Sequence, residues 1–557
     1  MISVQNLPLQ LNGNNVYINF MLYRMKKYFI SMFVIALATI MVSTNALSQT
    51  LNGEVLKFGR TLGLIESSYV DTIDLNKLTE KAIVEMLRSL DPHSTYISAK
   101  DVKEAHEQLA GNFEGIGIQF DVLRDSIIVV EPIVGGPSEK VGLRAGDRIV
   151  VIDGEKVTGI GLTTAGVRSR LLGARGTKVN ISVYRKGENE LLDFVITRDR
   201  IPIYSLDAAY MLNNDVGYIK LSRFAATTEK EFSDAVAKLE KSNMQHLVLD
   251  LRGNGGGYMI AATQIVEKFF ADQKLLVYIS GRKTQRQDFN SKGKGNLASM
   301  RVVVLTDESS ASATEILSGA LQDWDRAVII GRRTFGKGLV QNEFNLTDGS
   351  MIRLTVARYY TPTGRSIQSP YDEGYDKYIE NFYKRYTSGE MLTADSIHVP
   401  DSLKFSTLIN KRIVYGGGGI IPDVFVASDT TYRTQYFVRL YNREIFRSFA
   451  VDYFDKNRTQ LVDKYKVLSE FMDDFQFSQE DIKNFIARGE SDGIRYNDAQ
   501  FNTSKEEILL ILKGYLAMNI WQTSEYYQIV NQNDKTVEKA LQVISDKKVY
   551  DELLGYK

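Results

Sequence analysis

The hydrophobic positions along this chain repeat with different periods in different segments, and each period predicts a different kind of structure. Residues 49–110 carry apolar side chains at close to helical spacing, as in KLTEKAIVEMLRSL, and predict a helical N-terminal region. Residues 111–200 contain short apolar runs separated by Gly and Pro turns, among them GIGIQF and DRIVVIDG. These runs predict a small domain with several strands and two short helices.

Between residues 201 and 430, apolar runs typical of strands alternate with helical patterns. HLVLDLRG, RVVVLT and AVIIG read as strands, whereas YMIAATQIVEKFF and ATEILSGALQDW read as helices. This order predicts a mixed α/β core in which helices cover a sheet, and hence a multidomain α/β protein. Residues 371–410 are polar, charged and aromatic, and we expect a surface insertion there.

Residues 431–557 predict a helical C-terminal domain. Two expected helix starts have capping-box spacing, Ser478 with Asp481 and Ser504 with Glu507. The second precedes EEILLILKGYLAMNIW, which is apolar nearly all round and predicts a buried helix.

The segment over residues 1–48 has the layout of a secretory signal region with its start at Met25. Lys26 and Lys27 precede an apolar run, and Ala46 and Ser48 suit the small-residue positions before a cleavage site. The run is short for a membrane span, which needs about 20 apolar residues. We expect an exported protein, with the periplasm as its compartment. A retained anchor close to the membrane is the alternative.

The amino-acid composition excludes several kinds of catalytic and binding site. The sequence has no cysteine, which excludes disulfides, thiol catalysis and thiolate metal sites. Lys plus Arg equals Asp plus Glu at 68 each, so no overall charge favours nucleic acid or an anionic membrane. The four histidines, His93, His106, His246 and His398, lie in contexts that do not indicate a catalytic base.

SSASATEI, residues 309–316, contains the candidate nucleophile. Ser312 is followed three residues later by Glu315, which by itself is a capping-box match at a helix start. The same position suits catalysis, because the N–H groups at a helix N-terminus stabilise a developing oxyanion. A serine hydroxyl still needs a base.

GRRTFGKGLVQ, residues 331–341, offers a lysine base. Lys337 lies between Gly336 and Gly338, and it would act as a base only if its pKa were lowered by burial or by nearby positive charge. A solvated lysine in a glycine turn is the alternative. A further alternative is a phosphate-binding loop over residues 331–338, although Gly338 stands where a Ser or Thr should hold magnesium.

LDLRGNGGGYM, residues 249–259, is the third candidate element. Its glycines follow a predicted strand and precede a predicted helix, so their N–H groups could face a phosphate or an oxyanion. A flexible turn is the alternative.

Taken together and in order, LDPHSTYIS, DLRGNGGG, SSASATEI, TFGKG, RYYTPTGRSIQ and GGGIIPD resemble the motifs of the carboxyl-terminal processing peptidases. This serine peptidase family includes tail-specific protease, and the resemblance covers residues 50–430. It implies that Ser312 is the nucleophile, Lys337 the general base and Gln341 the residue that orients the lysine. It also implies an oxyanion hole formed by the backbone N–H groups of Ala313 and Gly256, with Gly255 as the other candidate.

Residues 111–200 resemble the PDZ domain that this family inserts, most clearly in GPSEKVGLRAGDRIVVIDG. The resemblance implies a carboxylate-binding loop at Gly115, Ile116, Gly117 and Ile118, with the substrate tail added as a strand beside it. Relatives often place an activating arginine where this chain has Leu172. Arg175 lies nearby, and whether it substitutes is left open.

The sequence thus predicts an exported Ser–Lys endopeptidase that binds protein C-terminal tails through its PDZ-like domain. It predicts no metal, no other cofactor and no nucleic-acid partner, and it leaves a homo-oligomer open. The competing hypothesis is a non-catalytic PDZ-type scaffold that binds tails on a peptidase fold.

Overall fold

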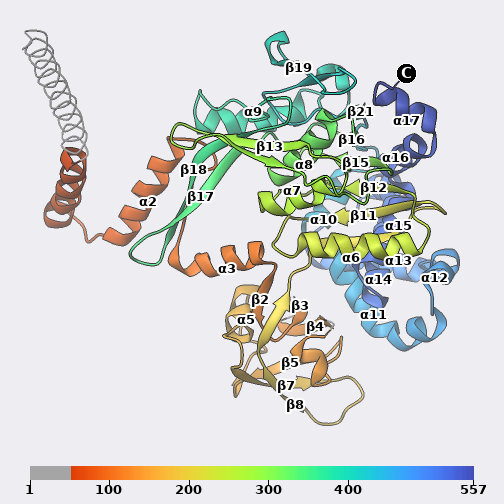
Figure 1. Ribbon diagram of the computed structural model, residues 1–557. Helices are drawn as coiled ribbons and strands as arrows, with labels where there is room; N and C mark the ends of the chain where they lie inside the picture. Colours follow the sequence, from red (N-terminus) through yellow and green to blue (C-terminus); the bar gives the residue numbers. More distant parts are fainter. Residues whose placement is uncertain (1–51, 124, 134, 557) are drawn as a thin grey trace, which may run out of the picture. The chain divides into compact units, whose positions relative to one another are not determined.

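A computed structural model describes residues 52–123, 125–133 and 135–556 of the chain (Figure 1). The chain divides into two compact units, residues 1–85 and 86–557. In the first unit, residues 52–68 form a helix, and α2 (Leu75–Arg88) begins after a short turn. The predicted signal segment lies outside the described residues. Among the described residues, no helix combines the length and the apolar character needed to cross a membrane.

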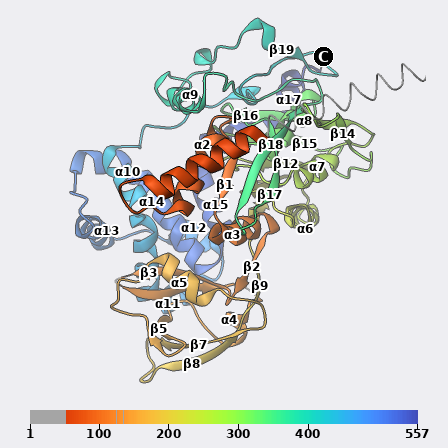
Figure 2. The ribbon, with the colours of Figure 1, turned by 90° about the vertical axis from the view of Figure 1, so that its left-hand side faces the viewer.

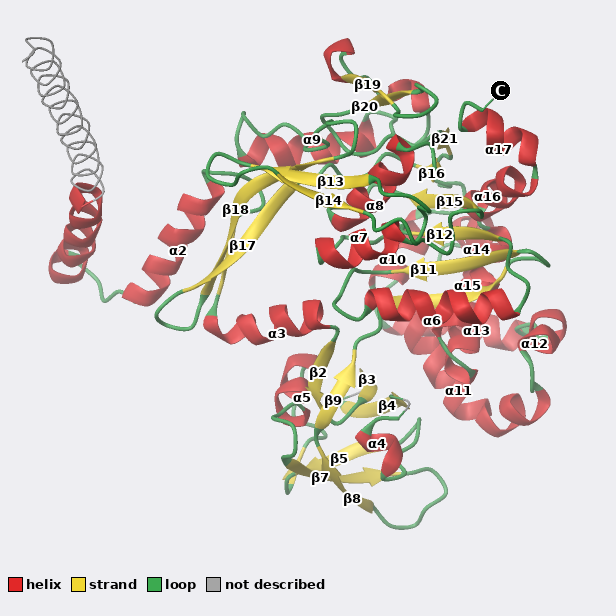
Figure 3. Cartoon of the chain, in the orientation of Figure 1, coloured by secondary structure: helices red, strands yellow, loops and turns green. Residues whose placement is uncertain are grey.

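The region predicted as a small β-rich domain forms a five-strand path in the order β3-β4-β5-β7-β8, with β6 beside β5. β3 pairs only with β4 among the described strands, so its other edge is open. A two-stranded ribbon, β2 with β9, carries the chain into and out of this inserted domain (Figure 3). The elements are β2 (Asn112–Gly115), β3 (Ile118–Leu123), β4 (Ser126–Pro132), α4 (Pro137–Lys140), β5 (Arg148–Ile152), β6 (Glu155–Lys156), α5 (Thr164–Leu171), β7 (Lys178–Tyr184), β8 (Leu192–Thr197) and β9 (Asp199–Pro202).

The centre of the second unit is a six-stranded sheet in the order β10-β11-β12-β15-β16-β21. All neighbours are parallel except β10, which is antiparallel at one edge. Leu247 and Leu249 of β12 point into one apolar layer and Val248 into the other, because both faces of a parallel sheet are covered. The strands are β10 (Leu206–Met211), β11 (Val216–Leu221), β12 (His246–Asp250), β15 (Arg301–Thr306), β16 (Val328–Gly331) and β21 (Val424–Phe425).

Two sets of helices cover this sheet. One face packs against the helices that alternate with the strands, as the sequence predicts, and the other packs against the last helices of the chain. The first set is α6 (Thr228–Lys241), α7 (Met259–Glu267) and α8 (Ala313–Asp323), and the second is α15 (Thr523–Val530), α16 (Lys535–Ser545) and α17 (Lys547–Leu553).

A second, antiparallel sheet contains the order β1-β18-β13-β14, with β17 paired to β18. β18 lies between the segment after Lys337 and the segment after His93, because it pairs with β17 along one edge and with β1 along the other. The described chain also contains α3 (Ala99–Ala110) before the inserted domain. The strands are β1 (Thr95–Ile97), β13 (Leu275–Ser280), β14 (Gln287–Asn290), β17 (Leu339–Asn345) and β18 (Met351–Tyr360).

Residues 371–410 are more than the surface insertion that their polarity predicts. They contain α9 (Tyr375–Thr387), whose Arg385 is buried. The Arg385 guanidinium donates to the carbonyls of Arg333 and Thr334, at 2.6 and 2.9 Å. The segment therefore packs on the loop that leads to Lys337. A two-stranded pair, β19 (Lys404–Ser406) with β20 (Ile413–Tyr415), follows α9.

The helical domain packs around aromatic side chains, and α11 lies beside the inserted domain (Figure 2). Its long helix α14 is buried along residues such as Ile508, Leu512 and Leu516, as its apolar sequence predicts. Ser478 caps α13 as predicted, but Ser504 does not start a helix. α14 begins earlier with Asn497 as its N-cap, and the Ser504 hydroxyl donates to the Tyr432 carbonyl. Besides α15, α16 and α17, which lie on the central sheet, the helical domain contains α10 (Gln435–Asn442), α11 (Ile445–Lys464), α12 (Leu468–Asp474), α13 (Gln479–Ser491) and α14 (Asp498–Ile520).

We expect Ile544→Ala to lower the free energy of unfolding by about 2–5 kcal/mol, because Ile544 is fully buried between α16 and the sheet. Lys539→Ala, at an exposed position of the same helix, is the matched control and should change it by less than about 0.5 kcal/mol. Urea unfolding followed by circular dichroism measures both. Equal effects would contradict the packing of α16 on the sheet.

Candidate active site

Ser312 lies where the loop after β15 turns into α8. Its backbone has φ of 57° and ψ of −116°, a conformation that is rare for a residue with a side chain and that is found where the surrounding structure enforces it. The capping-box residues are in place as predicted, and the Ser312 N–H donates to Glu315 Oε2 at 2.8 Å. The Ser312 hydroxyl itself forms no side-chain cap hydrogen bond.

The other hydroxyls of SSASATEI have different surroundings. Ser310 Oγ donates to the Leu251 carbonyl at 2.9 Å, and Thr314 Oγ1 donates to the Asn254 carbonyl at 2.9 Å. Both are fully buried and hold α8 to the neighbouring loop. Ser309 is exposed. Ser312 thus stands at the N-cap of α8, and among the described residues its hydroxyl makes no bond to the neighbouring loop of the kind that Ser310 and Thr314 make.

Glu315 joins the Ser312 segment to the Lys337 segment. Its carboxylate is 0% exposed and accepts hydrogen bonds from the backbone N–H groups of Gly336 and Lys337, at 2.7 and 2.9 Å. Thr334 Oγ1 also donates to it. Because the same carboxylate accepts the Ser312 N–H, the two segments meet at one buried side chain.

A second bridge connects the same two segments. The Tyr359 hydroxyl lies within hydrogen-bond distance of the carbonyls of both Ser312 and Lys337, and its ring is buried.

Burial raises the pKa of Glu315 to about 7, even though its hydrogen-bond donors favour the ionised form.

The Lys337 side chain has the electrostatics that a base needs. Burial, helped by the positive charge of Arg353, lowers the pKa of Lys337. Its Nζ donates to Gln341 Oε1 at 3.3 Å, and Gln341 Nε2 in turn donates to the His93 carbonyl. Within the described part of the chain, Ser312 Oγ and Lys337 Nζ share no hydrogen bond, so the ammonium points toward Gln341 in this conformation.

His93 belongs to this site, although its sequence context predicts only a turn residue. Its ring packs edge-on against Tyr378 and also contacts Phe335, two residues before Lys337. Burial and the charge of Lys337 lower the pKa of His93 to about 4. The Asp91 carboxylate accepts the His93 and Ser94 N–H groups and fixes the turn. Only the fold, which pairs β1 with β18, brings this turn to Lys337.

The glycine loop, residues 251–257, lies beside Ser312. A Cβ on Gly256 would stand 2.7 Å from Ser312 Cβ, so only glycine allows this approach. The Gly256 N–H, however, donates to Asn254 Oδ1 at 2.9 Å. In contrast, the N–H groups of Ala313 and Gly255 donate to no protein acceptor in the described ranges. Of the two predicted oxyanion donors, Ala313 is thus available and Gly256 is already partnered.

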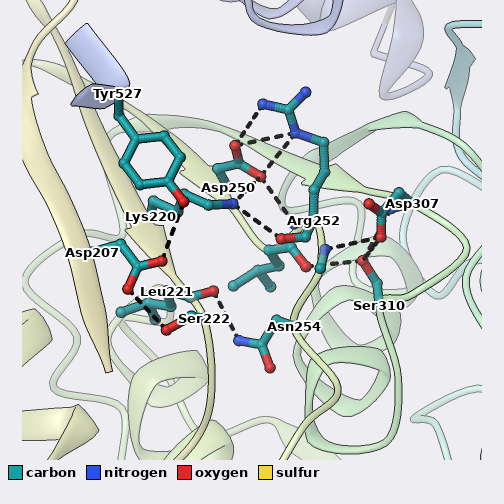
Figure 4. Close-up of polar contacts among 12 residues, drawn as sticks. Asp207, Lys220, Leu221, Ser222, Asp250, Arg252, Asn254, Asp307, Ser310 and Tyr527 are labelled. Carbon is teal, nitrogen blue, oxygen red and sulfur yellow. Dashed lines mark hydrogen bonds and ion pairs between the residues drawn. The ribbon is translucent and has the colours of Figure 1, made fainter. Parts of the chain in front are cut away.

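A buried ionic network supports the glycine loop from the sheet side (Figure 4). Asp250 at the end of β12 accepts hydrogen bonds from Arg252 and from the Tyr218 hydroxyl. Burial opposes ionisation of Asp250, but the charges of Arg252 and Lys220 outweigh it and hold its pKa well below the usual range. The sequence gives no signal for these roles beyond the charged residues that flank the strand.

The predicted carboxylate loop has donors that face no protein acceptor. The N–H groups of Ile116 and Gly117 make no hydrogen bond with the described residues, while their carbonyls accept from Ser138 and Ile133. Gly117 has φ of 73°. Gly115 and Ile118 flank this loop at the ends of β2 and β3, and Leu172 lies against Gly115. Backbone donors therefore stand next to the open edge of β3.

Two features that the sequence leaves open can be located in the structure. Arg175 is exposed, and its Nε lies 2.8 Å from Asp199 Oδ1. The segment 331–338 lacks the helix of a phosphate-binding loop, because β16 is followed by a turn and then by β17. Its N–H groups at Gly336 and Lys337 are directed to Glu315. The nucleotide alternative has no geometric support.

Sequence profiles of known families match four parts of the chain. Peptidase family S41 matches residues 215–374, and PDZ domain matches residues 115–195. Activating protease CtpB N-terminal domain matches residues 18–101. A family of unknown function, DUF8443, matches residues 436–522 in the helical domain.

Individual relatives are similar to this chain over part of its length. The carboxy-terminal-processing protease of Bartonella bacilliformis is 36% identical over 348 residues, which cover 61% of this chain and 78% of the relative. Carboxy-terminal processing protease CtpB of Bacillus subtilis is 36% identical over 314 residues, covering 56% of this chain but 65% of the relative. A solved photosystem II D1 C-terminal processing protease has 30% identity and a TM-score of 0.32, and the match covers 56% of this chain and 90% of that chain.

The surroundings of Lys337 predict the pH dependence of peptide hydrolysis at this site. With Lys337 as the general base that the family resemblance implies, activity should rise with pH as Lys337 loses its proton, with a midpoint below the ordinary lysine pKa. Arg353→Gln removes a positive charge that disfavours the Lys337 ammonium, so the pKa of Lys337 rises. The rising part of the pH–activity profile then moves to higher pH. We expect kcat/KM at pH 7 to fall about threefold to tenfold.

Profiles of kcat/KM against pH measure this shift. Arg358→Gln is the matched control, because Arg358 lies on the same strand but donates to the Tyr371 hydroxyl. A profile of Arg353→Gln that superimposes on the wild-type profile would exclude this electrostatic role.

Proposed function

Because the chain belongs to the carboxy-terminal processing protease family of S41 serine peptidases, we propose that it is a Ser–Lys endopeptidase that cleaves protein C-terminal tails. Ser312 would be its nucleophile and Lys337 its general base. The observation that carries this proposal is the convergence of both segments on Glu315, together with the lowered pKa of Lys337.

The proposed reaction is acyl transfer in two steps. Neutral Lys337 Nζ takes the proton of Ser312 Oγ as the oxygen attacks the scissile carbonyl, and the tetrahedral intermediate carries the negative charge on the former carbonyl oxygen. The C–N bond then breaks, and Lys337 gives the proton to the leaving amine. Water hydrolyses the acyl-serine by the same proton route, which returns both residues to their starting forms.

The two donors in contact with this intermediate would be backbone N–H groups. Ala313 N–H is free to donate, and the glycine loop would supply the second after a small rotation that releases the Gly256 N–H from Asn254. Lys337 would likewise leave Gln341 to meet Ser312. Both changes involve side-chain and peptide rotations around a backbone that Glu315 and Tyr359 hold fixed.

The PDZ domain would bind the substrate tail. An extended peptide can add to the open edge of β3, and its terminal carboxylate would accept from Ile116 and Gly117. We also propose that the protein is exported, most simply to the periplasm, on the basis of the signal pattern over residues 25–48.

Ser312→Ala tests the nucleophile. We expect kcat for a fluorogenic peptide with a free apolar C-terminal residue to fall at least about a thousandfold, with an unchanged melting temperature. Ser309→Ala, in the same loop, is the matched control and should keep wild-type activity. If Ser312→Ala cleaves as fast as wild type, the assignment is wrong. If neither the wild type nor Ser312→Ala cleaves the peptide but both bind it, a non-catalytic tail-binding scaffold is the better description.

Tail capture can be tested on Ser312→Ala without turnover. We expect a peptide with an amidated C-terminus to bind at least about tenfold more weakly than the same peptide with a free carboxylate. The amide lacks the charged oxygens that would accept hydrogen bonds from the N–H groups of the loop. Fluorescence anisotropy measures both affinities. Equal affinities would contradict a carboxylate-binding role for Ile116 and Gly117.

A further inference from the structure

We propose that the C-terminal helical domain holds the glycine loop in its catalytic position, with Asp534 as the positioning residue. This inference rests on the proposed function, because the loop matters only if Ser312 generates an oxyanion beside it. It assigns a role to a part of the chain that lies outside the matched peptidase and PDZ segments.

Asp534 connects the helical domain to the first residues of the glycine loop. Its Oδ2 accepts from Arg252 Nη1 at 2.7 Å, in an ion pair whose side chains are 17% and 25% exposed. Its Oδ1 caps α16 by accepting the N–H groups of Thr536 and Val537, at 2.8 and 3.1 Å. Because the cap fixes the carboxylate, Arg252 meets a rigid partner.

The remaining donors of Arg252 are directed to Asp250. Its Nε and Nη2 lie 3.0 and 2.6 Å from the two oxygens of that buried carboxylate. The guanidinium is therefore held from two sides, by the end of β12 and by the start of α16. This placement fixes the residue at which the chain leaves the sheet to form the glycine loop.

Hydrogen bonds carry this restraint through the loop toward Ser312. The Arg252 carbonyl accepts from Lys220 Nζ, and the Gly253 N–H donates to Asp307, each at 3.0 Å. The Asn254 carbonyl accepts the Ala311 N–H at 3.0 Å, directly before Ser312. Figure 4 shows Arg252 paired with Asp250, the contact of the loop with Asp307, and the Asn254 side chain joined to Leu221.

Apolar packing does not replace these contacts on the outer side of the loop. A Cβ on Gly253 or Gly255 would meet no atom within 4 Å. Arg252, Gly253 and Asp534 instead line a cavity of about 690 Å³ between the core and the helical domain. With open space on this side, the position of the loop depends on its polar partners.

The same helical domain also contacts the PDZ domain. Arg447 of α11 lies 3.7 Å from Asp121 of β3, and Arg458 donates to the Ala145 carbonyl. Residues 431–557 thus contact β3 through α11 and the start of the glycine loop through Asp534. Transition-state stabilisation by backbone donors requires that such donors be held in place.

Asp534→Asn is the discriminating variant. Asparagine caps a helix about as well as aspartate, so α16 keeps its N-cap while Arg252 loses the charge of its partner. We expect kcat for the fluorogenic tail peptide to fall about tenfold to a hundredfold with KM unchanged, because the loop and not tail binding is affected. Asp534→Glu should restore part of the activity.

Asp546→Asn is the matched control. Asp546 caps α17 in the same way, because its Oδ1 accepts the N–H groups of Lys548 and Val549. Among the described residues it makes no contact with the glycine loop. We expect wild-type kcat and KM from this variant. A loss of activity equal to that of Asp534→Asn would show that general weakening of the helical domain is responsible, and would overturn the inference.

A readout that does not depend on turnover separates this inference from the proposed function. In the Ser312→Ala background, Asp534→Asn should speed amide hydrogen exchange over residues 251–257 while Asp546→Asn leaves it unchanged. Wild-type kcat and unchanged exchange in Asp534→Asn would overturn the positioning role while Ser312 stays the nucleophile. Cleavage that survives Ser312→Ala would overturn the proposed function and this inference together.

Discussion

The buried carboxylate of Glu315 is the interaction on which the rest of the site depends. It accepts N–H groups from the residue at the start of α8 and from the loop after β16, so two segments that follow different strands are fixed to one point. Burying a carboxylate is costly unless donors surround it, and four donors do so. The cost of burying an unpaired carboxylate favours this one arrangement of the two loops, because few other loop conformations would supply donors to Glu315.

The site combines a rigid backbone with side chains that have alternative partners. Lys337 is bound to Gln341 and the Gly256 N–H to Asn254, while the backbone of both segments is held by Glu315 and Tyr359. On the proposed function, these partners would be exchanged by local rotations. Such a division would keep the Ser312 and Lys337 segments close together until a substrate is bound.

Local patterns in the sequence predict much of this fold. Alternating and continuous apolar runs locate the strands of the central sheet, and the strand-to-helix turn locates Ser312. Contacts between distant segments are not predictable in the same way. Arg252 and Asp534 are 282 residues apart, and nothing in either local sequence indicates that they meet. His93 and Arg385 are similar cases, because only the pairing of β1 with β18 and the packing of α9 bring them to Lys337.

Where local pattern and structure differ, a tertiary contact provides the reason. Ser504 has capping-box spacing, yet its hydroxyl is used to anchor the segment before α10 and the helix begins at an earlier residue. The polar, aromatic composition of residues 371–410 suggests a solvated surface, yet Arg385 satisfies backbone carbonyls in the interior.

The open edge of β3 has a consequence for how substrates would be chosen. A strand edge pairs with any extended backbone, because its donors and acceptors belong to the main chain and not to particular side chains. A tail that is packed in a folded protein cannot offer such a backbone. On the proposed function, the protein would therefore discriminate between proteins by the conformational freedom of their ends, and loss of structure at a C-terminus would itself mark a chain for degradation.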